Sequence, residues 1–107
     1  MVYDANAIDI IGEREDGGIE FYVISSGAFD DSEEQQMLLL DKIENYLTYM
    51  SSNQFKEEFP VVSESNRWII FQLDEPPSKL LLSLCDKIND WVKENGANFS
   101  VRISNRN

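Results

Sequence analysis

The sequence contains no histidine and only one cysteine among its 107 residues. Without an imidazole, one chain cannot build a Ser-His or Cys-His nucleophile pair, an imidazole general base or a usual zinc or iron site. The single thiol, Cys85, excludes an internal disulfide and a cysteine-rich metal cage, and it fits a reducing compartment. These absences remove most hydrolases. The sequence therefore predicts a protein that is not an enzyme and that holds no metal or cofactor.

Long apolar runs are also missing. No apolar stretch approaches the roughly 20 residues of a membrane span, and residues 1–9 have neither the basic start nor the apolar core of a signal peptide. We therefore expect a cytoplasmic protein with no membrane contact. The apolar content of 42% is ordinary for a globular protein, and with the chain length it predicts one folded domain over residues 1–107.

Positive charge is scarce, because 9 lysines and arginines stand against 20 aspartates and glutamates, a net charge of −11. Residues 1–66 hold 15 acids and 3 bases, a net of −12, whereas residues 67–107 hold 5 acids and 6 bases, a net of +1. A phosphate-binding face needs clustered basic residues, so no nucleic acid is expected as a partner. A charge that served only solubility has no reason to be so unevenly distributed, although many small bacterial domains are simply acidic.

Apolar periodicity predicts the element order β-β-α-β-α-β. Residues 6–26 form two strands joined at Asp16-Gly17-Gly18, where the glycines can supply the positive φ of a tight turn. Residues 67–75 and 98–104 have the alternating apolar pattern of strands.

The two helices are expected over Ser32–Ser52 and Pro77–Asn95, with Gly96 as a left-handed cap residue. Ser32 and Gln35 have the spacing of a capping box, and acids in a first turn are favoured by the helix dipole. Each helix carries one apolar stripe. The stripes are Leu39, Leu40, Ile43, Tyr46, Leu47 and Met50 in the first helix, and Leu81, Leu84, Cys85, Ile88 and Val92 in the second.

A helix with a single apolar stripe covers a sheet, so we expect an α+β two-layer sandwich. It would consist of a mostly antiparallel four-stranded sheet with two helices on one face. The other sheet face would show Tyr22, Ile24, Trp68, Ile70 and Arg102 to solvent or to a partner. Alternatively, a loop such as residues 55–66 would fold over this face.

Three segments resemble a group of small acidic bacterial proteins classed only as a domain of unknown function. They are an IDIIG-like strand (residues 8–12), an LLLLxxKINxYL-like helix (residues 37–50) and the step Phe59-Pro60. Lys42 and Tyr46 occupy the positions of the helix motif, whereas Glu44 departs from its asparagine. The resemblance covers most of the chain and implies a fold without an activity.

Two functions remain open. The first is an immunity or antitoxin protein that blocks the basic active site of a toxin, for example a nuclease, because an acidic surface fits such a cleft and steers association. The alternative is a stand-alone structural or adaptor domain whose acidity only aids solubility. In both cases we expect a monomer when the protein is free.

The partner-binding surface is predicted on the first helix and the residues before it. Acids on the face opposite the apolar stripe gain nothing from the helix end, and an acid beside an exposed leucine and tyrosine has the composition of an interface. The predicted binding residues are Asp30, Asp31, Glu34, Leu38, Asp41, Asn45 and Tyr49.

Overall fold

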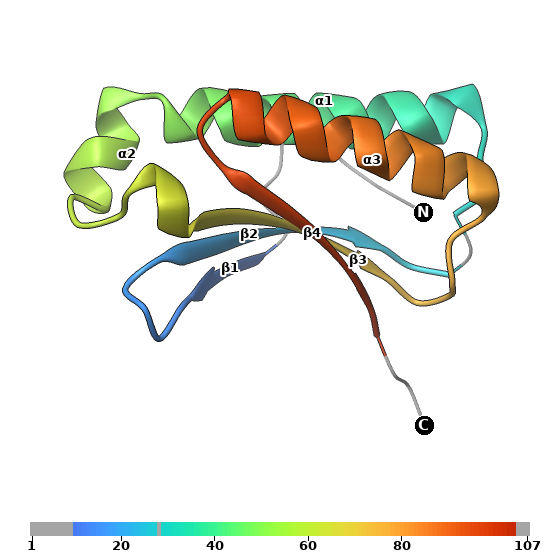
Figure 1. Cartoon of the computed structure of the whole chain (residues 1–107), viewed down its shortest axis with the longest axis horizontal. Coiled ribbons are helices and arrows are strands. Elements are labelled where there is room, and N and C mark those ends of the chain that lie inside the picture. Colours follow the sequence, from blue (N-terminus) through green and yellow to red (C-terminus); the bar gives the residue numbers. More distant parts are fainter. Residues whose placement is uncertain (1–9, 28, 105–107) are drawn as a thin grey trace.

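The computed structural model describes residues 10–27 and 29–104. Within these residues the strands are β1 (Ile10–Glu13), β2 (Ile19–Ser25), β3 (Arg67–Leu73) and β4 (Asn98–Ile103), and the helices are α1 (Glu33–Met50), α2 (Asn53–Glu58) and α3 (Lys79–Glu94). A 3-10 turn, Glu64–Asn66, precedes β3. The helices lie in one layer and the sheet in a second (Figure 1). The prediction of an α+β fold with two layers is confirmed at this level.

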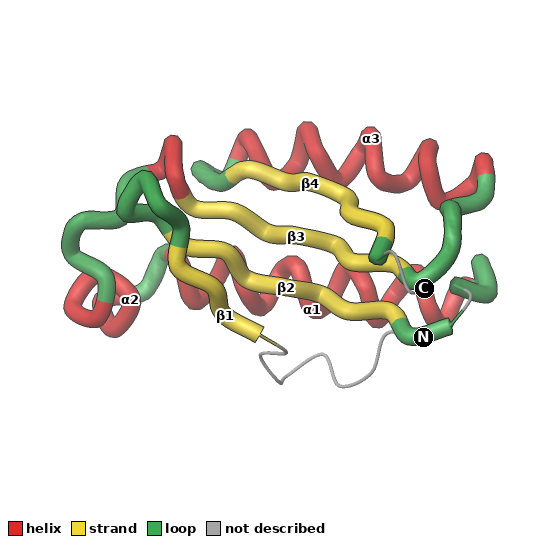
Figure 2. The backbone as a smooth tube through the Cα atoms, turned by 90° about the horizontal axis from the view of Figure 1, so that it is seen from below, coloured by secondary structure: helices red, strands yellow, loops and turns green. Residues whose placement is uncertain are grey.

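The sheet is mixed, so the expectation of a mostly antiparallel sheet was wrong. Its strand order is β1-β2-β3-β4. β1 pairs with β2 in antiparallel register, whereas β2 with β3 and β3 with β4 are parallel pairs. The reason is the helix between each of these parallel strands, because α1 and α3 return the chain to the sheet end where the preceding strand began. Figure 2 shows the three parallel strands side by side.

Three helices are present in the described residues, one more than expected. The additional helix, α2, lies in a stretch that we expected to be a polar loop. It begins because the Oγ of Ser52 accepts a hydrogen bond from the backbone N–H of Phe55 at 3.1 Å, and because Phe55 is buried. α2 and the following segment lie at one end of the two layers (Figure 1). The alternative in which residues 55–66 cover the open sheet face was therefore wrong.

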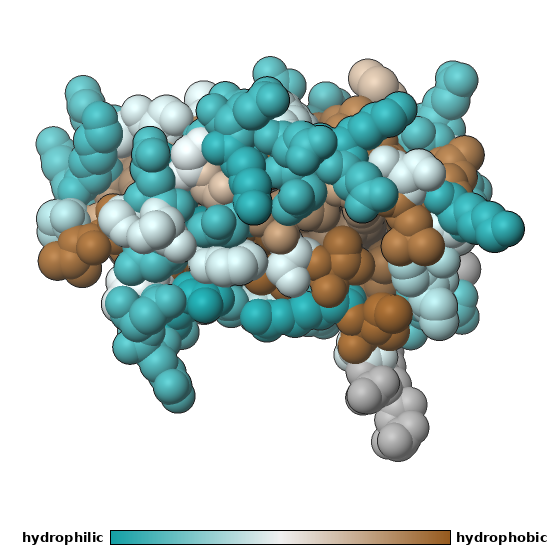
Figure 3. Space-filling view, in the orientation of Figure 1, coloured by the Kyte–Doolittle hydropathy of each residue, from teal (hydrophilic) through white to brown (hydrophobic). Residues whose placement is uncertain are grey.

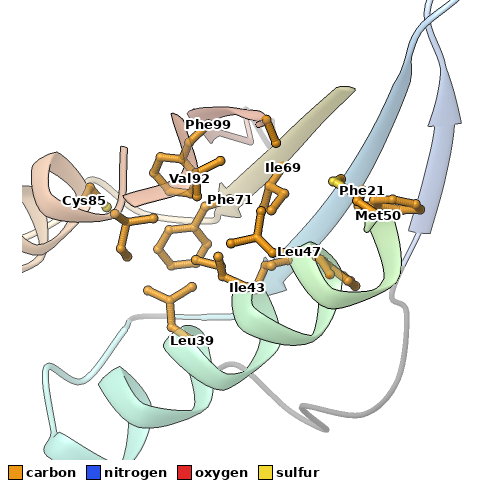
Figure 4. Packing of buried hydrophobic residues seen from close by; sticks show 14 of the residues in the cluster. Phe21, Leu39, Ile43, Leu47, Met50, Ile69, Phe71, Cys85, Val92 and Phe99 are labelled. Carbon is orange, nitrogen blue, oxygen red and sulfur yellow. The ribbon is translucent and has the colours of Figure 1, made fainter. Parts of the chain in front are cut away.

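The core fills the space between the sheet and the two long helices. Figure 4 shows Leu39, Ile43 and Leu47 of α1 directed toward the sheet, with side chains of α3 beside them. All but two of the predicted stripe residues are buried. The exceptions, Leu40 and Leu84, are half-buried and pack against the same core.

The predicted ends of the helices are largely confirmed. The Oγ of Ser32 accepts a hydrogen bond from the N–H of Gln35 at 3.1 Å, and Gly96 has a φ of 78° after α3. The start of α3 differs, because Ser78 caps the helix and α3 begins at Lys79. Pro77 precedes this cap and is not the first helical residue. The predicted first strand extends before Ile10, and that part lies outside the described residues.

Within the described part of the chain, no helix combines the length and the apolar character that a membrane span requires.

Candidate protein-binding surface

The solvent-facing side of α1 carries a row of acids. Glu34, Asp41 and Glu44 are exposed and follow one another at helical spacing, with Met37 between the first two. Residues three and four apart on a helix are neighbours, so these side chains form one continuous strip. Met37 is 58% exposed, which makes it the most exposed large apolar residue of α1. We call Glu34, Met37, Asp41 and Glu44 the acidic strip.

No base compensates the acidic strip on its own helix. The only basic residue of α1 is Lys42, and its side chain is fully buried. Four acids of α1 are exposed, namely Glu33 and the three of the strip. α3, in contrast, carries three acids and three lysines, all exposed. The uneven charge of the sequence therefore appears on the surface as a difference between the two long helices.

The two aspartates that precede α1 form its entry turn. Asp30 is exposed, and its Oδ1 accepts hydrogen bonds from the N–H and the hydroxyl of Ser32 at 3.1 and 2.7 Å. These bonds hold the pKa of Asp30 below its usual value. Asp31 is half-buried and has a positive φ of 56°. Both aspartates are therefore at least partly engaged in local structure, whereas Glu34 and Asp41 point to solvent.

Two of the predicted binding residues are not exposed anchors. Leu38 is half-buried and packs against the core. Tyr49 is also half-buried, with its ring centroid 5.8 Å from that of Phe21 and 5.6 Å from that of Phe55. The expectation that Tyr49 extends into solvent was wrong because α2, which the sequence did not predict, brings Phe55 against it.

The hydroxyl of Tyr49 is used within the protein as well. It donates a hydrogen bond to Glu58 Oε2 of α2 at 2.7 Å. Partial burial, together with this bond and the charge of Glu58, raises the pKa of Tyr49 to about 12. Tyr49 therefore joins α1 to α2. Asn45 is exposed on α1 next to the acidic strip.

The structure thus brings Glu34, Asp41 and Asn45 together on one helix face and assigns Leu38 and Tyr49 to packing. Sequence reasoning missed Met37 and Glu44 as members of this face. The signal was available, because positions 37 and 44 lie on either side of Asp41 at spacings of four and three residues.

The open sheet face carries a second polar cluster. Glu20 is 8% exposed, and its carboxylate binds Arg14 at 2.8 Å, Arg102 at 3.0 Å and the hydroxyl of Tyr22 at 2.8 Å. The guanidinium of Arg14 lies 4.8 Å from the ring centroid of Trp68. These side chains and their neighbours leave Ile70 with no exposed surface. The expected apolar patch is therefore only partly open, because Ile70 is buried and the guanidinium groups of Arg14 and Arg102 lie over the rings of Trp68 and Tyr22.

The electrostatics of this cluster hold Glu20 in its charged form. Burial opposes ionisation, but the hydrogen bond from Tyr22 and the nearby charges of Arg102 and Arg14 outweigh it, so that the pKa of Glu20 lies below its usual value. Burial and the same carboxylate raise the pKa of Tyr22. Every polar group of the cluster is paired with another, which suits a structural role.

Candidate metal ligands do not gather anywhere in the described residues. Among residues 10–27 and 29–104, no three acidic or cysteine side chains gather as metal ligands. Cys85 is buried on α3, and burial together with the charge of Asp86 raises the pKa of its thiol to about 11. A thiol with such a pKa is a poor nucleophile at neutral pH.

Comparisons with known proteins identify the family but no activity. No curated protein matches the sequence significantly, and no solved structure matches the fold significantly. The sequence does match a family of unknown function, DUF6572, over residues 1–105. This range includes the acidic strip and the whole sheet. The chain therefore belongs to the family of unknown function DUF6572.

Proposed function

We propose that this protein is a small acidic protein-binding domain of the cytoplasm, an immunity or antitoxin protein that blocks the basic active site of a toxin. The observation that supports this most is the acidic strip, because the only base of α1 is buried and four exposed acids remain. Such a helix face presents one sign of charge without internal neutralisation. The protein acts by binding in this proposal, and it has no catalytic step.

A basic partner follows from the chemistry of the strip. Toxins that cleave nucleic acids hold phosphates with lysines and arginines, and three carboxylates along one helix can replace those phosphates. Unlike charges also speed the encounter of the two proteins. The strip lies on a helix that is fixed by its buried side, so little conformational freedom is lost on binding.

Met37 supplies the apolar contact that Tyr49 cannot. Its flexible thioether adapts to different pockets, and methionine is enriched at the centre of interfaces. It lies between Glu34 and Asp41 on the same face. We propose that Met37 anchors the complex while Glu34, Asp41 and Glu44 select a basic partner.

The test begins with the product of the gene that neighbours this one, expressed with and without this protein. Asp41→Lys combined with Glu44→Lys is expected to weaken binding by at least about 2 kcal/mol, or roughly 30-fold, in isothermal titration. The matched control is Asp86→Lys combined with Asp90→Lys on α3, which changes the net charge equally. We expect it to cost less than about 0.5 kcal/mol, because rim charges away from the contact contribute little.

The adaptor alternative makes a different prediction. If acidity serves only solubility, the α1 and α3 double variants should bind the partner alike, or the neighbouring gene should encode no basic partner. Cells that express the neighbouring gene together with this protein would then not be protected from toxicity. Either result would exclude α1 as the binding surface of an immunity protein.

A further inference from the structure

A groove runs between α1 and α3 along the helix layer. The two helices run in the same direction, because each returns the chain between two parallel strands. Figure 2 shows them side by side along the sheet. Near the beginning of the helices, Gln36 of α1 and Leu80 of α3 line a hollow of about 430 Å³. Near their ends, Glu44 of α1 and Trp91 of α3 line a second hollow of about 340 Å³. The lining positions of α3 are spaced by three or four residues, so both hollows belong to one groove.

The floor of this groove is apolar. Leu84 and Trp91 on α3 are half-buried and pack against the core, so part of each side chain remains open. Leu40 of α1 is also half-buried, and it lies one helical turn from Gln36 on one side and from Glu44 on the other. An occupant with an apolar stripe of its own would cover this floor.

The other side of α3 is mostly polar. Figure 3 views the helix from the side away from α1 and shows mainly teal, hydrophilic residues along its middle. Leu80 lines the first hollow, whereas Leu82 lies on the opposite side of α3 by helical geometry. The two leucines are 48% and 50% exposed, so they differ in position and hardly in exposure. They therefore offer a matched pair of sites at which the groove can be tested.

The charges on the two sides of the groove are opposite in sign and unpaired. Asp41 and Glu44 on α1 form no ion pair with any of residues 10–27 and 29–104. Within the same residues, Lys79 and Lys87, which line the first hollow from α3, form none either. An occupant with bases toward α1 and acids toward α3 would therefore pair charges that the protein itself leaves free.

The backbone of the groove favours a helical occupant. Both sides are α-helices, whose backbone N–H and C=O groups are bonded within each helix. An extended segment would find no backbone partners there, whereas a helix satisfies its own backbone groups and presents only side chains. The part of α3 that lines the groove, residues 80–95, is about 22 Å long, so about four turns of a partner helix would fill it.

A second copy of the chain does not fit these charges. Each copy has a net charge of −11. Among the described residues, none of the helices α1, α2 and α3 has a net positive charge. A second copy therefore offers no basic helix to the acidic strip, whereas a basic partner protein does.

We propose that the groove between α1 and α3 binds an amphipathic helix of a partner protein. The apolar stripe of this helix would cover Leu80, Leu84 and Trp91, and its basic side would lie along the acidic strip. The inference deepens the proposed function and rests on it for the basic character of the partner. It adds one side of α3 to the binding surface. Asp86 and Asp90, which the control variant on α3 changes, do not line the groove.

The probe for this site is a capped synthetic peptide of about 16 residues. Its leucines recur at helical spacing, with lysines along one side of the leucine stripe, glutamates along the other and alanine elsewhere. The chain has two tryptophans, Trp91 in the groove and Trp68 in β3. In NMR titrations of the whole protein, the indole N–H signal of Trp91 is expected to shift, and that of Trp68 is expected to stay in place.

Two control peptides test the chemistry of the occupant. A peptide of the same composition with its lysines and glutamates mixed on both sides should bind at least about tenfold more weakly at low salt, because it cannot match both helices. A central proline should also weaken binding at least about tenfold, because it breaks the helix. Equal binding of either control peptide would overturn the proposal, and so would no binding of the first peptide at about 1 mM.

Two protein variants test the place of binding. Leu80→Gln should weaken binding of the peptide at least about fivefold, because the exposed half of the leucine would be covered in the complex. Leu82→Gln is the matched control and should change binding less than about twofold. Glutamine is a good helix former, so both variants keep the fold. Equal effects of the two variants, or a Trp91 signal that stays in place while the peptide binds, would overturn the proposal.

The same leucine variants separate this inference from the proposed function. With the product of the neighbouring gene as partner, Asp41→Lys combined with Glu44→Lys could weaken binding while Leu80→Gln does not. The proposed function would then hold, and the groove would be excluded as the docking site. If the peptide occupies the groove but the product of the neighbouring gene does not bind, the groove is supported and the proposed function fails.

Discussion

Two charged side chains are each held by several partners, and they stabilise opposite faces of the sheet. Arg67 donates through Nε to the carbonyl oxygen of Gly96 at 2.5 Å and through Nη1 to that of Met50 at 3.3 Å. One guanidinium therefore serves the C-terminal ends of α3 and α1, where a cation is favoured by both helix dipoles. On the open sheet face, the carboxylate of Glu20 likewise binds two partners, because it forms ion pairs with both Arg14 and Arg102.

Arg67→Ala is expected to lower the free energy of unfolding by about 2 to 3 kcal/mol in urea titrations, because two part-buried carbonyl acceptors lose a charged donor. Arg67→Lys should recover less than half of this loss, since an ammonium cannot reach both oxygens in the fork geometry of arginine. Lys93→Ala, an exposed change in the last turn of α3, is the control and should cost less than about 0.5 kcal/mol. Equal effects at the two positions would show that Arg67 does not join the helices.

Glu20 is predicted to make the fold sensitive to acid. Its folded pKa lies below its usual value of 4.5, so the native state stabilises the ionised form. This stability is present above pH 4.5 and is lost as pH falls through the folded pKa. The stability difference between the parent protein and Glu20→Gln should therefore shrink as the pH is lowered from neutral to below 4.5 in urea titrations. A difference that stays constant over that range would contradict the pairing of Glu20 with the two arginines.

At the scale of elements, α1 combines two kinds of acid. Glu33 and Glu34 lie in the first turn, where the helix dipole favours them, and Ser32 caps the same end. Asp41 and Glu44 lie in the middle of the helix and gain nothing from its end. Substitution of the first-turn acids should therefore change the stability of the fold, whereas substitution of the mid-helix acids should change the affinity for a partner. Glu34 belongs to both groups.

The first turn of α1 offers a direct check. Ser32→Ala is expected to cost about 1 kcal/mol of stability through loss of the cap. Glu33→Gln together with Glu34→Gln should cost no more than about 1 kcal/mol, because dipole interactions of exposed acids are small. Asp41→Asn, in the middle of the helix, should leave the unfolding midpoint almost unchanged in the same urea titrations. A larger loss for Asp41→Asn than for Ser32→Ala would refute this division of α1.

At the scale of the whole molecule, the charges are divided between the two long helices. α1 exposes acids without a base, whereas the charges of α3 are balanced. The open sheet face adds two arginines around Glu20. The net charge of −11 is therefore not spread evenly over the surface. A partner approaching α1 meets a stronger negative potential than one approaching α3 or β4.

This distribution predicts how salt affects the proposed complex. Raising the ionic strength from about 0.01 to 0.15 M shortens the screening length from about 30 to 8 Å. In stopped-flow measurements the association rate with a basic partner should fall, whereas the dissociation rate should change much less. An association rate that does not depend on salt would contradict electrostatic steering by α1.

Much of the fold was predictable because its causes are local. The turn at Gly17, the cap at Ser32 and the left-handed Gly96 each depend on a few neighbouring residues, and the structure has all three. The apolar stripes of α1 and α3 were likewise visible as a period of 3.6 residues. The outward position of Asp41 on α1 follows from the same period. For such features the sequence alone was sufficient.

Tertiary structure decided the rest. Whether two strands are parallel or antiparallel depends on the sheet end to which α1 and α3 return the chain. The residues of a strand do not by themselves specify which strand will be its neighbour. The burial of Lys42 and the packing of Tyr49 depend on elements distant in sequence, including Phe55 on α2. Helical periodicity predicts the direction in which a side chain points around the helix axis, but it does not predict which other element packs against that side chain. For this reason the sequence indicated an acidic helix, and only the fold showed that no exposed base of α1 neutralises it.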